Sequence, residues 1–255
     1  MIKIVILGAG NLGTHLFRVF TQANEVSVVQ WYNRSQESLK QHQKDVAITY
    51  QLDHLMEADV YLLALSDDAI PITAKELAPL KGIVAHTAGS VPMDALKQHT
   101  NQGVFYPLQT FSKNRAVNFK SIPICIEANS DKNRETLTKL AEAIGENIHY
   151  INSIQRMGLH TAAVYVNNFT NHLYQVGAQI CEEQEVSFDL LRPLIAETAN
   201  KIESITPKKA QTGPALRNDK MTLQKHMDQL INPVFKNLYL TLTESIQKND
   251  EYSKL

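Results

Sequence analysis

Residues 2–13 read IKIVILGAGNLG, an apolar and β-branched run that ends in the pattern GxGxxG. A continuous apolar run of this kind is typical of a parallel strand that is covered on both faces. Apolar residues then recur at helical spacing (Leu12, Leu16, Val19), and a second β-branched run follows at 26–31. A strand, a helix and a second strand within this stretch predict a βαβ unit.

The GxGxxG pattern lies directly after the expected strand and at the start of the expected helix, which is the context of a dinucleotide-binding turn. There Gly8 permits the tight turn, Gly10 lets the backbone approach the pyrophosphate, and Gly13 lets the helix pack closely on the sheet. The alternative is a glycine-rich turn without a ligand. The expected cofactor contacts in this turn are Gly8, Ala9, Gly10, Asn11, Leu12 and Gly13.

The end of the second expected strand indicates which dinucleotide binds. An NAD site usually has Asp or Glu there to accept from the ribose hydroxyls, whereas this chain has Asn33, Arg34 and Ser35. Arg34 can pair with a 2′-phosphate through two hydrogen bonds, and the two neighbours can donate further ones. The segment predicts NADP, the alternative being that Arg34 is a solvated loop charge. Leu65 and Ser66, which follow a later strand, are expected to border the nicotinamide.

The remaining sequence predicts a doubly wound α/β sheet followed by a helical domain. Further strands are expected at 60–65, 83–86, 104–106, 122–127 and 148–151, separated by helix-like stretches such as 131–144. This alternation is typical of a Rossmann-type, doubly wound parallel sheet. Long helical periodicities then follow at 154–184, at 189–204 and from 222 onward. We therefore expect an NADP-binding domain at 1–152 and an all-α substrate and dimerisation domain at 153–255.

Composition narrows the possible partners. Lys and Arg (25 residues) nearly balance Asp and Glu (26 residues), so no overall field would attract nucleic acid or an anionic membrane. Cys125 and Cys181 lack the spacing of metal ligands or of a disulfide framework, which predicts buried free thiols and no metal site. The amino terminus lacks the features of a signal peptide, and no apolar run reaches about 18 residues. These observations predict a cytoplasmic protein whose partner is a small molecule.

Two loops at strand ends are candidates for a substrate site. In HTAGS (86–90), His86 can exchange a proton near neutral pH and Ser90 can bind a carbonyl or carboxylate group. The alternatives are a satisfied buried histidine and a helix N-cap. In YPLQTF (106–111), the polar residues Gln109 and Thr110 lie between apolar ones at an expected crevice wall, the alternative being an ordinary turn with satisfied side chains.

The helical domain supplies further polar candidates. On the helix expected at 154–184, His160, Asn167 and Asn171 fall within about 20° of one face at about 100° per residue. This stripe can place His160 and Asn167 near a substrate; the alternatives are internal hydrogen bonds or a subunit interface. Arg217 can hold a substrate carboxylate, the alternative being a structural contact with Asp219 together with helix capping.

Six motifs together carry a family resemblance: GAGNLG (8–13), YNRS (32–35), HTAGSVP (86–92), YPLQTF (106–111), NNFTNHL (167–173) and TGPALRND (212–219). Over nearly its whole length the chain resembles Rossmann-like bacterial proteins with a C-terminal domain of unknown function. More distant relatives include deazaflavin-dependent NADP oxidoreductases, pyrroline-5-carboxylate reductase, and the β-hydroxyacid and 6-phosphogluconate dehydrogenases. The resemblance implies an NADP-binding domain, a helical domain that often makes a homodimer, and a site between them.

One departure from these relatives bears on the mechanism. In β-hydroxyacid dehydrogenases a catalytic lysine precedes an asparagine by one helical turn. Here Ala163 and Val164 stand one turn before Asn167 and Asn168, so that mechanism is not carried over.

The leading hypothesis is an NADP-dependent oxidoreductase that acts on a small carbonyl, imine or hydroxyacid. The residues expected around the substrate are His86, Ser90, Gln109, His160, Asn167 and Arg217. His160 is the expected proton donor, with Asn167 orienting the substrate. The rival hypothesis is a non-catalytic NADP(H) sensor or scaffold dimer, which the missing lysine favours. Hydride transfer to a deazaflavin is a third possibility.

Overall fold

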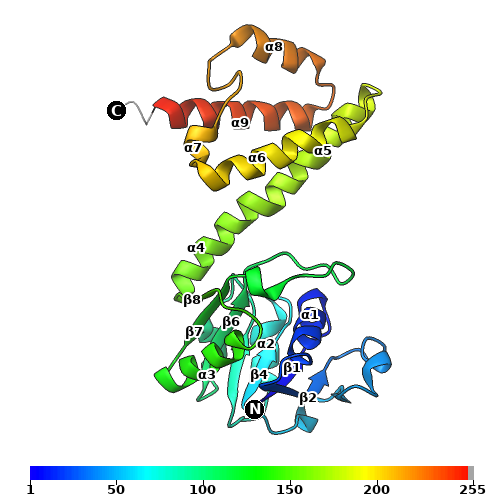
Figure 1. The fold of residues 1–255 in the computed structure, drawn as a ribbon, viewed down its shortest axis with the longest axis vertical. Helices are drawn as coiled ribbons and strands as arrows, with labels where there is room; N and C mark the ends of the chain where they lie inside the picture. The colour runs from blue at the N-terminus through cyan, green and yellow to red at the C-terminus, as the bar shows by residue number, and fades with distance from the viewer. Residues whose placement is uncertain (252–255) are drawn as a thin grey trace. The chain divides into compact units, whose positions relative to one another are not determined.

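The computed structural model describes residues 1–251 of the chain. Internal contacts divide the chain into two compact units, Met1–Val164 and a second that begins at Tyr165. The first unit is a sheet flanked by helices, whereas the described part of the second contains helices and no strand (Figure 1). The expected fold class, a Rossmann-type α/β unit followed by an all-α region, is confirmed.

The first unit is built on one eight-stranded sheet in the order β3-β2-β1-β4-β5-β6-β7-β8. Its strands are β1 (Ile2–Leu7), β2 (Val26–Tyr32), β3 (Ala47–Thr49), β4 (Val60–Leu63), β5 (Ile83–His86), β6 (Gln102–Pro107), β7 (Ile124–Ala128) and β8 (Ile148–Tyr150). The order reverses between β1 and β4, and open α/β sheets bind ligands beyond the carboxyl ends of the strands at such a point. The glycine turn after β1 therefore lies at the switch point.

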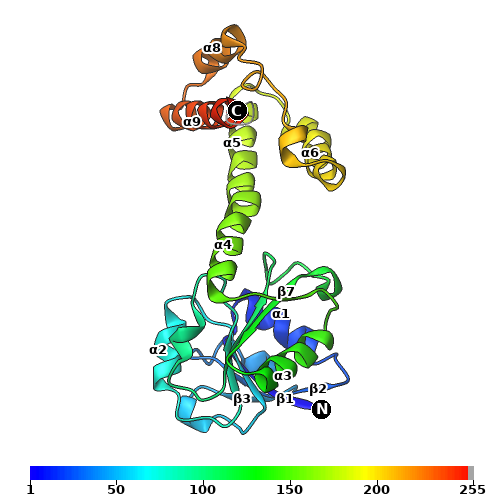
Figure 2. The same ribbon diagram turned by 90° about the vertical axis from the view of Figure 1, so that its left-hand side faces the viewer.

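Helices cover both faces of the sheet. α1 (Asn11–Phe20) and α3 (Asp131–Glu142) lie on one face, and α2 (Ala69–Glu76) lies on the other (Figure 2). Successive side chains of a strand point to opposite faces, so Ile4 packs on the side of α1 and Val5 on the side of α2. Burial on both faces explains why residues 4–7 of β1 are all apolar.

Two features of the sheet differ from the prediction. β7 runs antiparallel to β6, and it pairs Cys125 with Tyr106 and Glu127 with Val104. The connection between these strands contains only a short 3-10 turn (Phe119–Ser121) and no crossover helix of the kind that a parallel pair requires. The sequence also missed β3, because three residues are too few to show a period.

The long helix expected at 154–184 is interrupted. α4 (Ser153–Ala163) is followed by a π-helix (Val164–Phe169) and then by α5 (Thr170–Glu183). The Thr170 hydroxyl donates to the carbonyl of Tyr165, five residues earlier. Because a π turn takes in an extra residue, the α-helical spacing that aligned His160 with Asn167 does not continue through this segment.

The described part of the second unit continues with a 3-10 helix (Phe188–Leu191) and four further α-helices. These α-helices are α6 (Arg192–Ser204), α7 (Pro207–Ala210), α8 (Lys220–Gln229) and α9 (Pro233–Glu251). Among residues 1–251, no helix combines the length and the apolar character needed to span a bilayer.

α4 begins at a well-formed cap. The Asn152 side chain accepts a hydrogen bond from the Gln155 amide, and the Gln155 side chain accepts one from the Asn152 amide, which is a capping box. The domain boundary predicted after residue 152 falls at this cap and stays a prediction, while the first compact unit runs on through α4 to Val164.

Candidate functional site

The turn between β1 and α1 has the geometry of a dinucleotide cradle. Gly8 has a φ of +113°, which favours glycine, and a Cβ there would lie 2.2 Å from the carbonyl oxygen of Ala64. A Cβ on Gly13 would lie 2.2 Å from the Gly8 carbonyl oxygen, so this glycine permits the close approach of α1. A Cβ on Gly10 would meet no atom within 4 Å. The space beside Gly10 is therefore open, as a backbone contact with a pyrophosphate requires.

Asn33, at the end of β2, braces this turn. Its Oδ1 accepts a hydrogen bond from the Ala9 amide at 3.2 Å, and its Nδ2 donates to the Ser35 carbonyl at 3.1 Å. Both ends of the Asn33 side chain are thus used within the protein, a role that the sequence did not reveal. Arg34 and Ser35 are exposed, which leaves the Arg34 guanidinium available to a 2′-phosphate.

The loop after β4 also meets the cofactor turn. The Leu65 side chain lies 3.1 Å from the position of a Cβ on Gly8. The Ser66 carbonyl accepts from the amide of Ala69 at 2.9 Å and so starts α2. The next residue, Asp67, accepts a hydrogen bond from the Ser90 hydroxyl. That bond ties the loop after β4 to the loop after β5, and it replaces the N-cap role considered for Ser90.

His86 is fully buried at the end of β5. Its Nδ1 accepts a hydrogen bond from the Ala88 amide at 3.2 Å. Burial, followed by the charge of Arg156, lowers the pKa of His86 from 6.5 to about 3. The ring is therefore neutral at neutral pH. This agrees with the buried histidine considered as the alternative, except that His86 is not fully satisfied, because its buried Nε2 has no hydrogen-bond partner.

His160 of α4 lies beside Tyr106 at the end of β6. The Nδ1 atom of His160 is 3.1 Å from the Tyr106 hydroxyl oxygen, and the two rings meet edge to face with centroids 6.2 Å apart. Tyr106 belongs to a small apolar cluster with Val104 and Cys125, against which Leu159 packs. Half-buried His160 is thus a polar group that α4 brings to the carboxyl edge of the sheet.

A buried ion pair anchors α4 to the sheet. Arg156 and Glu127 form it, with side chains 1% and 15% exposed. The Arg156 guanidinium also donates to the Val91 carbonyl at 2.6 Å. Ser153 donates to the same carboxylate through its amide at 3.0 Å and through its hydroxyl at 2.8 Å.

The sequence analysis missed this anchor, although signals for it are present. Glu127 is a charged residue at the end of the apolar strand ICIEA (124–128). On the sheet it lies in register with Val104, which is itself in register with His86. Arg156 precedes His160 by one helical turn, so the anchor sits directly beside the proposed proton donor.

The loop after β6 runs along α1. Gln109 is exposed, and its side-chain oxygen accepts from the Thr110 amide at 2.8 Å. Beyond it, a His15 ring nitrogen bonds the Ser112 carbonyl at 2.9 Å and the Arg18 guanidinium donates to the Lys113 carbonyl at 2.9 Å. This loop is thus tied to the helix that follows the cofactor turn.

Asn167 and Arg217 belong to the second unit, and both are exposed. Asp219 accepts from the Thr222 amide at 3.1 Å and from its hydroxyl at 2.7 Å, and these hydrogen bonds lower the pKa of the Asp219 carboxyl. The role of Asp219 is therefore to cap α8. Contact of Asn167 and Arg217 with a substrate stays a prediction.

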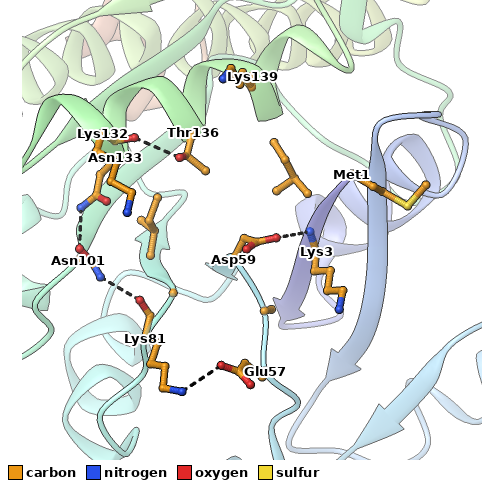
Figure 3. Close-up of a pocket in the computed structure, with 14 residues that line it drawn as sticks. Met1, Lys3, Glu57, Asp59, Lys81, Asn101, Lys132, Asn133, Thr136 and Lys139 are labelled. Carbon is orange, nitrogen blue, oxygen red and sulfur yellow. Dashed lines mark hydrogen bonds and ion pairs between the residues drawn. The ribbon is translucent and has the colours of Figure 1, made fainter.

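A cavity of about 630 Å³ lies at the opposite, amino edge of the parallel strands (Figure 3). Two carboxylates around it have partners within the protein: Glu57 lies 3.4 Å from the Lys81 ammonium group, and Asp59 accepts a hydrogen bond from the backbone amide of Lys3 at 2.8 Å. It contains no part of the glycine turn, so we do not assign the cofactor to it.

Known families match the two parts of the chain separately. Residues 3–89 match the family described as "NADP oxidoreductase coenzyme F420-dependent". Residues 122–246 match "Domain of unknown function (DUF2520)". No curated protein matches the chain.

Solved structures match the chain over almost its full length. A Bacteroides fragilis protein, provisionally assigned as an NADP oxidoreductase, is 37% identical over 97% of this chain and 98% of its own, with a TM-score of 0.87. An imine reductase from Pseudomonas sp. is 13% identical over 97% and 94% of the two chains, with a TM-score of 0.70. An imine reductase from Myxococcus stipitatus, solved with NADP+, is 11% identical over 98% and 93%, with a TM-score of 0.65. The two imine reductases share the fold.

The family predicted from the motifs and the cofactor class predicted from Arg34 are confirmed by these matches. The chain belongs to the family of NADP oxidoreductases that join a Rossmann-type N-terminal domain to this C-terminal domain of unknown function.

Proposed function

We propose that this protein uses NADPH to reduce a small imine or carbonyl compound, or uses NADP+ to oxidise the corresponding hydroxyacid. The position of His160 carries the proposal, because α4 sets its imidazole against Tyr106 at the carboxyl edge of the sheet. That edge also carries the glycine turn, after β1. Reduction of a C=N or C=O bond needs a proton donor besides a hydride. The imine reductases of similar fold support imines as a class to test.

The first unit supplies a group for each requirement of this reaction. The open backbone at Gly10 accepts the pyrophosphate, and Arg34 pairs with the 2′-phosphate. NADPH, when bound, supplies the hydride to the electrophilic carbon and is itself oxidised to NADP+. His160 gives the proton to the nitrogen or oxygen of the same double bond, which completes its reduction.

The other predicted residues are proposed to bind rather than to transfer protons. Ser90 and Gln109 lie in loops at the carboxyl edge of the first unit, where they can bind polar groups of the substrate. Asn167 and Arg217 are proposed to orient the substrate and to hold a carboxylate, respectively. His86, buried and neutral, is not part of this set.

We also propose that the helical unit forms a homodimer. Large apolar side chains are exposed on it, among them Val166 (74%), Leu190 (71%), Met221 (76%) and Ile231 (76%). Covering such side chains is what the interface of a permanent dimer does. Sedimentation equilibrium of the full chain is expected to give twice its 28.7 kDa mass; a monomer at micromolar concentration would contradict this part of the proposal.

The experiment is a screen of NADPH oxidation over imines and carbonyl compounds, with and without a terminal carboxylate. On the best substrate, His160→Ala is expected to lower kcat by about 10²- to 10⁴-fold, the usual contribution of a general acid. NADPH affinity should be retained. The matched control is His149→Ala, an exposed histidine on β8 of the same unit, which should leave turnover unchanged. Unchanged turnover in His160→Ala would remove the proposed role.

The same screen separates the rival functions. Tight NADPH binding without oxidation across the panel favours a sensor or scaffold. Oxidation that requires a deazaflavin as acceptor identifies transfer to the kind of coenzyme that the family description names.

A further inference from the structure

The His160 imidazole rests in a seat formed by two other elements. Tyr106 comes from β6, and Gly89 comes from the loop after β5. A Cβ on Gly89 would lie 2.5 Å from His160 Nδ1, 2.7 Å from its Cγ and 2.9 Å from Tyr106 Cζ. Real Cβ atoms do not approach other atoms this closely, so both rings pack directly onto the glycine backbone. This seat of Gly89 and Tyr106 fixes where the imidazole lies.

We propose that Tyr106 is a positioning residue that donates its hydroxyl hydrogen to Nδ1 of His160 and so holds the neutral imidazole as the Nε2–H tautomer. In this form Nε2–H is the hydrogen-bond donor left for a substrate. When the ring takes up a second proton for transfer, Nδ1–H donates to the Tyr106 oxygen instead, and loss of the Nε2 proton to the substrate leaves a neutral imidazole. The proton-transfer part of this inference rests on the proposed function, whereas the tautomer does not depend on it.

The direction of this hydrogen bond follows from the surroundings of Tyr106. The side chain is buried among Val104, Cys125 and Leu159. Burial, followed by the proximity of Cys125, raises the pKa of the Tyr106 hydroxyl to about 12. A buried hydroxyl hydrogen needs an acceptor, and among the described residues the Tyr106 hydroxyl has one hydrogen-bond partner, His160 Nδ1. Because the phenol keeps its proton near neutral pH, the hydroxyl donates to the unprotonated Nδ1 of a neutral imidazole.

Contacts around the seat also limit where the His160 imidazole can lie. Arg156, one turn earlier on α4, is held by Glu127 and the Val91 carbonyl, which fixes the helix beside β6. The planes of the Tyr106 ring and the imidazole meet at 72°. This ring contact and the hydroxyl hydrogen bond therefore both restrain the imidazole. Fixing one tautomer by a bond to the other ring nitrogen is how proteins orient a working histidine.

The test is the imidazole ¹⁵N spectrum of the full-length protein, recorded at a pH where His160 is neutral and assigned by loss of signals in His160→Gln. Wild type is expected to show a protonated Nε2 and an unprotonated Nδ1. In Tyr106→Phe, which keeps the ring and removes the hydroxyl, the two nitrogens should move toward averaged shifts of mixed tautomers. The second unit offers a matched control, because the Tyr239 hydroxyl lies 2.8 Å from His226 Nδ1. Tyr239→Phe should change the His226 signals and leave those of His160 unaltered.

Two spectral results would overturn the proposal: a protonated Nδ1 on wild-type His160, or a His160 pattern that Tyr106→Phe leaves unchanged. Fluorescence of Trp31, buried in the first unit, verifies that the variant is folded. With a substrate in hand, Tyr106→Phe should lower kcat by about 2- to 12-fold, as expected for the loss of one neutral hydrogen bond, with the KM for NADPH unchanged. Failure of the proposed function would remove this kinetic effect and leave the spectra as described.

Discussion

The ion pair between Glu127 and Arg156 predicts which of its two partners costs more stability when it is replaced, because the two side chains differ in burial. The Arg156 side chain is 1% exposed, and its Nε atom already lacks a hydrogen-bond partner. Glu127→Leu would leave this cation buried without its counter-charge. Removing one partner of a buried pair costs about 3–5 kcal/mol, which is a large fraction of the usual stability of a domain.

The opposite variant should cost less. The Glu127 carboxylate is 15% exposed and accepts hydrogen bonds from the Ser153 amide and hydroxyl, and Arg156→Met removes neither donor. Loss of the hydrogen bonds to one charged group then costs about 1.5–3 kcal/mol. The double variant strands no charge and fills the site with apolar groups, so it should be more stable than Glu127→Leu alone.

Urea unfolding measures these differences. Trp31 is the only tryptophan of the chain and stacks on Phe17 within the first unit, so its fluorescence follows the unit that contains the ion pair. With an m-value of about 2 kcal/mol/M, Glu127→Leu should lower the midpoint by about 2 M. The reasoning is refuted if Arg156→Met is the less stable single variant, or if the double variant is the least stable of the three.

The remaining predictions concern the cofactor turn and His86. Gly10→Ala should leave the urea midpoint unchanged and weaken NADPH binding at least about tenfold, because its Cβ meets no protein atom but would occupy the place of the pyrophosphate; calorimetry with NADPH checks this. Gly13→Ala should lower both the urea midpoint and the affinity for NADPH, because its Cβ would lie 2.2 Å from the Gly8 carbonyl oxygen. Burial keeps the pKa of His86 at about 3, against 6.5 for the ordinary group, so the unfolded chain binds the extra proton between these values. Stability should therefore fall by up to about 1.4 kcal/mol per pH unit below 6.5, and His86→Gln should show a shallower slope in unfolding curves taken above and below that pH.

Local sequence predicted those parts of the site that depend on neighbouring residues. The glycine turn requires only a strand, three glycines and a helix start within residues 2–20, and the structure has these elements at β1 and α1. The absence of an acid after β2 likewise needed no tertiary information to favour NADP.

The parts that the sequence did not reveal depend on contacts between distant residues. Asn33 reads as a donor to the cofactor, but its amide is used on Ala9 and Ser35. The sequence suggests that His86 titrates near neutral pH, yet burial and the charge of Arg156 lower its pKa and keep it neutral there. Neither outcome follows from spacing, because each is set by side chains that the fold brings together.

The apolar periodicity also predicted one continuous α-helix at 154–184, where the backbone changes from α-helical to π-helical spacing. The alignment of His160 and Asn167 assumed an unbroken α-helix, but the α-helix of His160 gives way to a π-helix at Val164–Phe169, and Asn167 lies within that π-helix. Apolar spacing does not distinguish an extra residue in one turn from a regular helix over so short a stretch.

The central claim is that the glycine turn and Arg34 select NADP(H), and calorimetric titration with NADPH and NADH tests it most directly. Wild type should bind NADPH more tightly than NADH. Arg34→Ala should weaken NADPH binding by about 10- to 150-fold, the loss expected for hydrogen bonds to a charged group, and leave NADH binding unchanged. Lys81→Ala, an exposed cation at the opposite edge of the sheet, serves as the control and should change neither affinity. Equal affinities for the two nucleotides in wild type, or an equal loss of both in Arg34→Ala, would contradict the claim.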